Sequence, residues 1–348
     1  MGVLQILSQE PGSGKTTLAT ALLVRLAQRQ ISGAYYKLFS KPDHSGGEDP
    51  NPEFIHQSLL APSGGPGIPS AQPLPTDSAT SSSLPDAMGR QIQSGVVSLR
   101  GPATGIIVDG PDLAAGTGLT STAAAQTTDL AGAKALVLFR HSPSLTVTGI
   151  MQTVEPFGSN LAGIAMTRVT KHRLEETKAG ILAELRSLGM PVVGLIPESR
   201  VLQGPTVRQI SETLGARWVQ EPVNLDAPVQ QFLIGGNIMD SGPEYYGRYD
   251  NQAVIVRSQR PDIQIASLLA GTRCLVLTGG GEPTEYVKTE AMQRDVPLMV
   301  VSSNTLDTAE ALAPLVDLAH PRNLAKITEF ARQLDGHLDM EGLLGLLA

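Results

Sequence analysis

Short apolar runs alternate with segments of helical periodicity along most of the chain. The first run, Met1 to Leu7, is followed by a polar, glycine-containing turn and then by leucines at helical spacing between Leu18 and Leu26. Strands that alternate with helices of about ten to fifteen residues predict a parallel sheet with helices on both faces. We therefore expect an α/β protein that binds its ligands at the carboxyl ends of the strands.

The expected elements of the first part are short strands and the helices between them. We predict strands at 1–7, 31–38, 105–109, 135–139, 161–166 and 191–196. We predict helices at 18–28, 87–99, 120–131, 145–156, 174–188 and 205–214. Residues 39–52 are polar and predict a loop. Residues 62–85 are rich in Pro, Gly and Ser, which predicts a flexible insertion without packed structure.

A second, smaller α/β domain is predicted after a linking segment at 224–228. Its strands are expected at 231–234, 253–257, 273–278 and 297–301, and its helices at 261–270, 284–294 and 305–312. Residues 324–348 predict an amphipathic helical tail whose apolar end docks or pairs. The chain is therefore expected to comprise one domain at 1–220, a second at 225–320, and a tail at 321–348.

The segment between the first strand and its helix carries the strongest chemical signal. Glycines at 12 and 14 let the chain wrap closely, so that backbone N–H groups can face an anion. The helix that begins near Lys15 adds its positive end, Lys15 a mobile charge for phosphates, and Thr16 a hydroxyl for Mg²⁺. A preceding strand and a following helix are the context of a phosphate loop. The predicted nucleotide-binding residues are Gly12, Ser13, Gly14, Lys15, Thr16 and Thr17.

Two carboxylates are candidates for the metal that accompanies such a nucleotide. Asp109 follows the apolar run 105–108, and at a strand end beside the loop it can hold Mg²⁺ through water. The alternative is that Asp109 only caps the turn at Gly110. Asp49 lies in a polar segment and either approaches Mg²⁺ or is a solvated loop residue. The predicted metal ligands are Thr16, Asp109 and Asp49.

Composition narrows the classes of function. The net charge of −7 argues against a generic nucleic-acid-binding surface. The single cysteine, Cys274, lies in an apolar run and predicts a buried hydrophobic residue, with neither a disulfide framework nor a zinc cluster. The start of the chain lacks the basic region of a signal peptide, and no apolar run approaches a membrane span. We expect a soluble, cytoplasmic protein with no membrane partner.

The first 220 residues resemble the dethiobiotin-synthetase-like P-loop domain at the start of long bacterial phosphotransacetylases. The matching segments are Glu10–Thr16, Tyr35–Lys37, Val108–Gly110, Gly194–Glu198 and Pro205–Val207. The usual first glycine of the loop is commonly replaced in that group, so Gln9 fits the resemblance. Residues 225–320 resemble the DRTGG domain that follows it there, mainly at Arg260–Ile263 and Leu275–Gly280.

The resemblance implies a P-loop NTPase-like fold followed by a smaller α/β DRTGG-like domain. The acetyltransferase domain of the long enzymes would need further residues beyond Ala348, so acetyl transfer is not expected. The resemblance places Lys37 near the substrate of the related synthetase, which makes Lys15 and Lys37 the catalytic candidates. The alternative is that Lys37 is only a strand-end lysine in solvent. Thr167 stands where the synthetase carries a base-binding asparagine, which argues against dethiobiotin synthetase itself.

Three functions remain open on the sequence. The first is a regulatory or sensory protein that binds Mg-ATP, or slowly hydrolyses it, and couples the nucleotide to the DRTGG domain. The second is an ATP-dependent enzyme that phosphorylates a small carboxylate or carbamate, with Lys37 and Lys41 gripping the anion. The third is a sensor of a small ligand through the DRTGG domain, where the glycines at 279–281 form either a ligand loop or a turn. A homo-oligomer is expected in each case.

Overall fold

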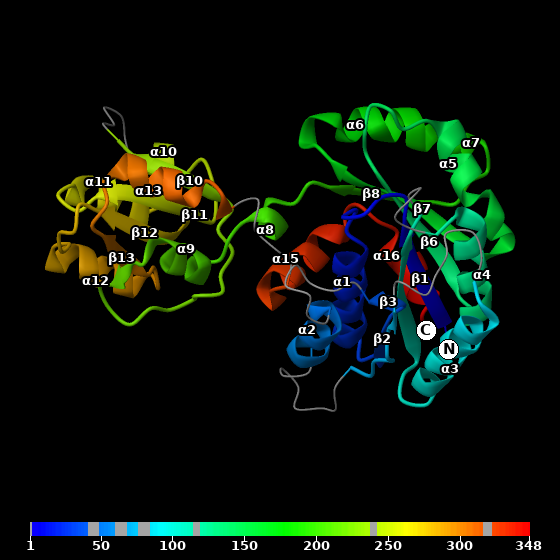
Figure 1. Ribbon diagram of the computed structural model, residues 1–348. Coiled ribbons are helices and arrows are strands. Elements are labelled where there is room, and N and C mark those ends of the chain that lie inside the picture. The colour runs from blue at the N-terminus through cyan, green and yellow to red at the C-terminus, as the bar shows by residue number, and fades with distance from the viewer. Residues whose placement is uncertain are drawn as a thin grey trace. The chain divides into compact units, whose positions relative to one another are not determined.

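The computed structural model describes residues 2–40, 49–59, 68–75, 84–113, 119–236, 242–315 and 322–348 (Figure 1). The chain forms two compact units, each an α/β fold built on its own sheet. The first unit comprises residues 1–198 and 330–348, and the second comprises residues 199–329. Within the described ranges, every helix is too short or too polar to cross a membrane.

The first unit is built on a six-stranded sheet of order β2-β5-β1-β6-β7-β8. Every neighbouring pair in this sheet is parallel. The strands are β1 (Gly2–Ser8), β2 (Gly33–Lys37), β5 (Gly105–Asp112), β6 (Lys134–Arg140), β7 (Leu161–Val169) and β8 (Val192–Pro197). Because β1 lies between β5 and β6, the segment that follows it opens at the middle of the carboxyl edge.

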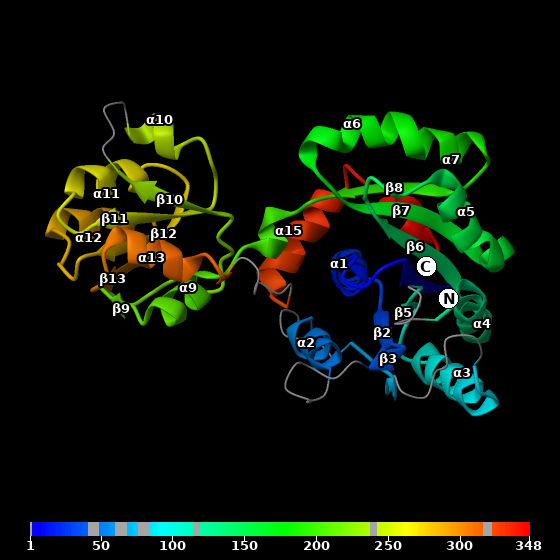
Figure 2. The ribbon, with the colours of Figure 1, turned by 45° about the horizontal axis from the view of Figure 1, so that its top comes forward.

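Helices cover both faces of this sheet, which confirms the predicted fold class (Figure 2). Helix α1 (Lys15–Gln28) packs on one face. The other face is covered by α3 (Asp86–Arg100), α4 (Ser121–Ala131) and α5 (Val147–Val154). Strand β1 is buried on both faces, because Leu4 and Ile6 alternate with Val3 and Leu7, and all four are buried. Beyond β7, α6 (Leu174–Thr177), a π-helical turn (Lys178–Leu182) and α7 (Ala183–Ser187) lead to β8.

Two stretches predicted to be irregular contain packed structure. A short strand β3 (Phe39–Ser40) and helix α2 (Pro50–Ser58) form within the predicted loop 39–52 and just after it. Strand β4 (Leu74–Pro75) pairs with β3, and Leu74 is buried in the core beneath it. The prediction of an unpacked insertion is therefore wrong for this part, since one apolar side chain anchors it. The remainder of that prediction, 62–67 and 76–83, lies outside the described residues.

The second unit is built on a five-stranded sheet of order β10-β11-β12-β13-β9. Its strands are β9 (Arg217–Trp218), β10 (Gln231–Gly235), β11 (Gln252–Arg257), β12 (Thr272–Thr278) and β13 (Leu298–Val301). Its helices are α8 (Arg200–Gln203), α9 (Val207–Leu214), α10 (Gly242–Tyr246), α11 (Pro261–Leu268), α12 (Glu285–Gln293) and α13 (Thr305–Leu312). Cys274 is buried in β12, as predicted, and burial raises the pKa of its thiol to about 12.

The division of the chain differs from the predicted boundary at 220. Strand β9 pairs antiparallel with β13 of the second sheet, where Arg217 lies opposite Val300. Val207 and Ile210 of α9 are buried with Val276 in the same core. Residues 199–220 thus belong to the second unit, because their apolar side chains are buried there. A two-residue antiparallel edge strand leaves almost no periodic signal in a sequence.

The C-terminal segment returns to the first unit. Helix α15 (Leu324–Leu334) and α16 (Met340–Gly345) lie at the chain end. Asp339 N donates to Val193 O at 2.9 Å, and Leu195 N donates to His337 O at 3.1 Å, so the segment borders β8. A Cβ atom on Gly105 would lie 2.7 Å from Leu347 O. Residues 330–348 of the predicted tail are therefore an integral layer across the amino ends of the strands of the first unit, opposite the edge where ligands are expected.

Candidate functional site

A tight loop joins β1 to α1 at the carboxyl edge of the first sheet. Gly12 and Gly14 both adopt left-handed backbone angles, with φ of 72° and 97°, which glycine adopts without strain. Ser13 Oγ donates to Glu10 O at 2.7 Å, and Ser8 Oγ donates to the same carbonyl at 2.8 Å. Gly14 is the N-cap of α1 and offers no side chain to cap it. The first N–H groups of the helix therefore remain available to an anion.

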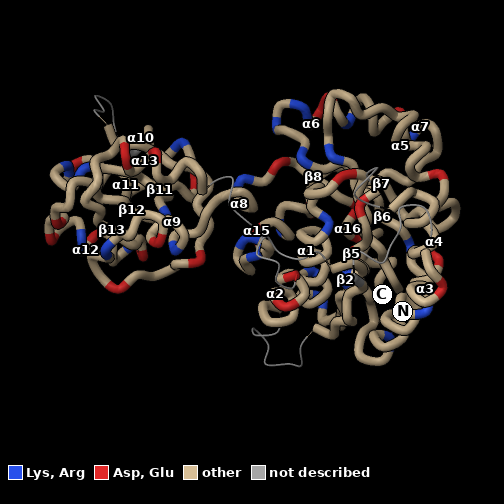
Figure 3. Tube along the Cα trace, viewed as in Figure 1, with Lys and Arg blue, Asp and Glu red and all other residues tan. Residues whose placement is uncertain are grey.

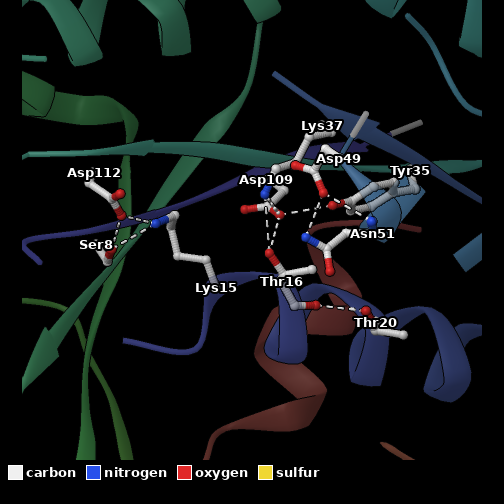
Figure 4. Close-up of polar contacts among 10 residues, drawn as sticks. All are labelled: Ser8, Lys15, Thr16, Thr20, Tyr35, Lys37, Asp49, Asn51, Asp109 and Asp112. Atoms are coloured by element: carbon white, nitrogen blue, oxygen red, sulfur yellow. Dashed lines mark hydrogen bonds and ion pairs between the residues drawn. The ribbon is translucent and has the colours of Figure 1, made fainter. Parts of the chain in front are cut away.

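Lys15 lies in a polar cluster that includes a carboxylate the sequence analysis missed. Its Nζ donates to Ser8 Oγ at 2.9 Å and forms an ion pair with Asp112 (Figure 4). Ser8 Oγ also lies 2.9 Å from Asp112 Oδ1. Burial lowers the pKa of Lys15 below its ordinary value, although the charges of Asp112 and Asp109 oppose that shift. The phosphate-loop lysine thus already has an anionic partner.

Asp109 is the centre of a second, adjoining cluster. Its Oδ2 accepts hydrogen bonds from Thr16 Oγ1 at 2.5 Å, Tyr35 OH at 2.8 Å and Lys37 Nζ at 2.7 Å. Lys37 Nζ also lies 3.2 Å from Thr16 Oγ1. Burial alone would raise the pKa of Asp109, but the charges of Lys37 and Lys15 lower it below its usual range. The fold thus brings together three segments that are far apart in sequence, namely the start of α1, strand β2 and strand β5.

The oxygen atoms of this cluster fit a small divalent cation. Asp109 Oδ1 is buried and has no hydrogen-bond partner, although its carboxylate is ionised. Thr16 supplies a hydroxyl oxygen beside the same carboxylate. Mg²⁺ is commonly bound by one or two protein oxygens, with water and phosphate filling its other positions. Among the described residues, no group of three or more His, Cys, Asp and Glu side chains is placed to hold a metal.

Asp49 lies at the border of this cluster and has a structural role of its own. Its Oδ1 accepts from Asn51 N at 3.0 Å and from Asn51 Nδ2 at 2.7 Å, which caps α2. Burial opposes the charged form of Lys37, but the charges of Asp109 and Asp49 prevail and raise the pKa of Lys37. The second carboxylate therefore adds negative potential near Lys37, and its approach to a metal stays a prediction.

Other sequence candidates lie elsewhere or outside the described residues. The glycine run at 279–281 belongs to the second unit. Gly279 N donates to Ser303 O at 3.0 Å, and Gly280 N donates to Val301 O at 2.9 Å. These two N–H groups are already hydrogen-bonded within a turn and cannot donate to an anion. The contacts therefore favour a turn over a ligand-binding loop. Lys41 lies outside the described residues.

A parallel sheet with a glycine loop before a helix, and an aspartate at the end of the adjacent strand, defines a P-loop nucleotide-binding fold. The family model for the CobQ/CobB/MinD/ParA nucleotide binding domain matches residues 4–204, more than half of the chain. The chain belongs to this family. A second family model, the DRTGG domain, matches residues 209–315.

Phosphate acetyltransferase from Acinetobacter baylyi (strain ATCC 33305 / BD413 / ADP1) is one curated relative. It is 25% identical over 194 residues, which cover 51% of this chain and 26% of that protein. The match therefore spans about a quarter of the length of the relative. The two-domain arrangement expected from the resemblance is confirmed by the two family models, and the similarity to a phosphotransacetylase by this relative.

Solved structures with related folds are only distantly similar. The MinD cell division protein of Aquifex aeolicus is 18% identical, with a TM-score of 0.37 over 58% of this chain and 84% of that chain. MinD from Pyrococcus horikoshii, complexed with Mg-ADP, is 16% identical, with a TM-score of 0.36 over 58% and 83%. The CBS and DRTGG domains of Clostridium perfringens pyrophosphatase, complexed with diadenosine tetraphosphate, give 16% identity and a TM-score of 0.30 over 35% and 54%. These similarities are too slight to support an inference about ligands.

Proposed function

We propose that the protein binds Mg-ATP at the phosphate loop and couples its nucleotide state to the DRTGG domain in a regulatory or sensory role. The observation that carries the proposal is the convergence of Thr16 and Lys37 on Asp109, whose second oxygen is buried and unpartnered. A buried, ionised oxygen without a donor is costly unless a cation or another partner satisfies it. Its position beside the loop matches the place where a nucleotide-bound metal is needed.

Different residues of the site would bind the phosphates and the metal of Mg-ATP. The N–H groups of the loop and of the first turn of α1 face the phosphate chain, and Lys15 exchanges Asp112 for phosphate oxygens. Thr16 and Asp109, with Asp49 nearby, would hold Mg²⁺, which supplies charge neutralisation when bound. Lys37 remains beside the metal ligands and can stabilise charge that develops on a phosphoryl group.

An enzyme is the alternative function, with the same site phosphorylating a small carboxylate or carbamate. The position of Lys37 favours it, because the ammonium lies 3.2 Å from Thr16 Oγ1 and can attract an anionic acceptor. A cation placed there serves substrate binding as well as nucleotide binding. In this reading Lys15 and Lys37 are both catalytic residues.

A small ligand at the DRTGG domain is part of the proposal. Ser258 follows β11 at the carboxyl edge of the second sheet, and its Oγ is buried without a hydrogen-bond partner. A Cβ atom on Gly281 would lie 2.6 Å from this hydroxyl, so the glycine loop packs directly against it.

The proposal also includes self-association of the chain into a homo-oligomer. Sedimentation of the protein with and without nucleotide tests this part of the proposal.

Nucleotide binding and turnover separate these functions. We would measure the Kd of Mg-ATP by calorimetry and the rate of phosphate release for the wild type and Lys15→Ala, with Lys178→Ala as a surface-charge control. Tight binding with negligible turnover supports the regulator, and turnover that rises with a small carboxylate supports the enzyme. Binding that Lys15→Ala does not weaken would contradict both.

A further inference from the structure

Arg168 has an unusual backbone conformation at the carboxyl end of β7. Its φ is 56°, in the left-handed region that few non-glycine residues occupy. The pairing of β7 with β8 is irregular between Met166 and Val169, which marks a bulge at this point. Bulges at strand ends often re-aim a side chain near a functional site. The strained backbone of Arg168 therefore indicates that its side chain makes a contact that compensates for the strain.

The side chain of Arg168 reaches the phosphate loop. A Cβ atom on Gly12 would lie 4.0 Å from Arg168 Nη2, so the guanidinium stands over the left-handed turn of the loop. Gly12 is one of the residues predicted to face phosphate. An arginine two strands away from β1 thus forms part of the wall around this loop.

Arg140 adds a second positive charge near Arg168. It ends β6 and is in register with Thr167 of β7. Partial burial lowers the pKa of Arg168 and the charge of Arg140 lowers it further, while the nearby carboxylate of Glu198 acts in the opposite direction. The two arginines are exposed, and neither has a hydrogen bond or ion pair from its side chain within the described part of the chain. Lys and Arg also gather on the segment that leads from β7 into α6 (Figure 3).

The charge balance of the site explains why such cations are needed. Lys15 and Lys37 already face the three carboxylates of Asp109, Asp112 and Asp49, which leaves these five side chains with a net negative charge. A nucleoside di- or triphosphate is itself strongly anionic. A site of this kind binds it only with additional positive charge, from a metal ion and from cations that have no carboxylate partner.

We propose that Arg168 is a phosphate-binding residue of the nucleotide site, with Arg140 as a second cation that strengthens the local positive potential. This inference rests on the proposed binding of nucleotide at the loop. The planar guanidinium donates to phosphate oxygens lying over Gly12, which compensates for the strained backbone and for the proximity of Arg140. The ligand chemistry is that of a diphosphate group.

Substitutions at Arg168 test the inference without removing the backbone geometry. Arg168→Asn tolerates the left-handed conformation and removes the charge, and Arg168→Lys keeps the charge but loses the paired donors. Arg186→Ala is the matched control, because Arg186 is an exposed arginine of α7 in the same unit. Thermal unfolding of each variant establishes that the fold is retained. Calorimetry then gives the Kd of Mg-ADP, Mg-pyrophosphate and adenosine between low and moderate salt.

We expect Arg168→Asn to weaken Mg-ADP and Mg-pyrophosphate in the same proportion, by about tenfold or more, since a charge-assisted hydrogen bond is lost. The salt dependence of both affinities falls, the affinity for adenosine is unchanged, and Arg168→Lys lies between the two. Loss of adenosine affinity with pyrophosphate binding retained would overturn the inference, because Arg168 would then contact the base. If Lys15→Ala abolishes binding and Arg168→Asn leaves it unchanged, this inference fails while the proposed function stands. If the wild type binds no nucleotide, both fail.

Discussion

Asp112 forms an ion pair with Lys15, the lysine of the phosphate loop. The carboxylate is almost completely buried, and Ser8 Oγ bridges the two groups at 2.9 Å from each. An anion that binds the loop therefore competes with an internal anion for the same ammonium. Binding of a phosphate to Lys15 therefore includes the free-energy cost of breaking the ion pair with Asp112.

Asp112→Asn is predicted to lower the stability of the ligand-free protein and to strengthen nucleotide binding. Removing one partner of a buried pair costs about 3 kcal/mol, and asparagine recovers part of this through its hydrogen bonds. In the variant, the phosphates of Mg-ATP no longer have to displace the Asp112 carboxylate from Lys15. The Kd of Mg-ATP therefore falls several-fold. The checks are urea unfolding and calorimetry.

The control for Asp112→Asn is Asp86→Asn, which removes an equal charge from an exposed position in α3. Weaker Mg-ATP binding in Asp112→Asn would mean that this carboxylate contacts the metal or orients water, and would contradict its role as a competitor.

Asp109→Asn is predicted to remove the magnesium dependence of nucleotide binding. In the wild type, chelation of Mg²⁺ with EDTA should weaken ATP binding by an order of magnitude or more, because the charge of the metal offsets that of the carboxylates. In the variant, EDTA should have little further effect. Nucleotide titrations at several Mg²⁺ concentrations measure this linkage, and an unchanged magnesium dependence would place the metal elsewhere.

Asp109 also predicts an acid-dependent loss of stability. Burial opposes its charge, but Lys37 and Lys15 lower its pKa in the folded state below the unfolded value of about 3.9. A depressed pKa stabilises the fold above the unfolded value, and this stabilisation is lost as the pH falls through the folded value. Urea unfolding between pH 7 and pH 3 should show a steeper decline for the wild type than for Asp109→Asn. Parallel curves would argue against the shift.

The C-terminal layer predicts a stability effect far from the site. Gly105→Ala places a methyl group 2.7 Å from Leu347 O, which forces backbone to move and should cost about 1 to 3 kcal/mol. Gly101→Ala is the control, because nothing lies within 4 Å of its added Cβ. Thermal unfolding and limited proteolysis of the C-terminus measure the difference. Equal melting temperatures would show that the tail is not held against β5.

The sequence located the phosphate loop and Asp109 because each depends on local order. A strand, two glycines and a helix start define the loop within twenty residues, and Asp109 ends an apolar run. Asp112 was missed because its role depends on a strand that continues through Gly110 and Pro111. Gly110 permits this, since a Cβ there would lie 2.9 Å from Gln5 Nε2 of β1.

The sequence by itself determined the alternation of strands and helices, the phosphate loop and the presence of two α/β units, because hydrophobic periodicity and turn chemistry act over short distances. Tertiary structure alone decided that Asp112 faces Lys15, that Arg168 stands over Gly12, and that residues 330–348 close the amino edge of the first sheet. Those relationships join segments far apart in the chain. The first two relationships exist because parallel pairing brings the carboxyl ends of β1, β5 and β7 to one edge, so that their charges meet.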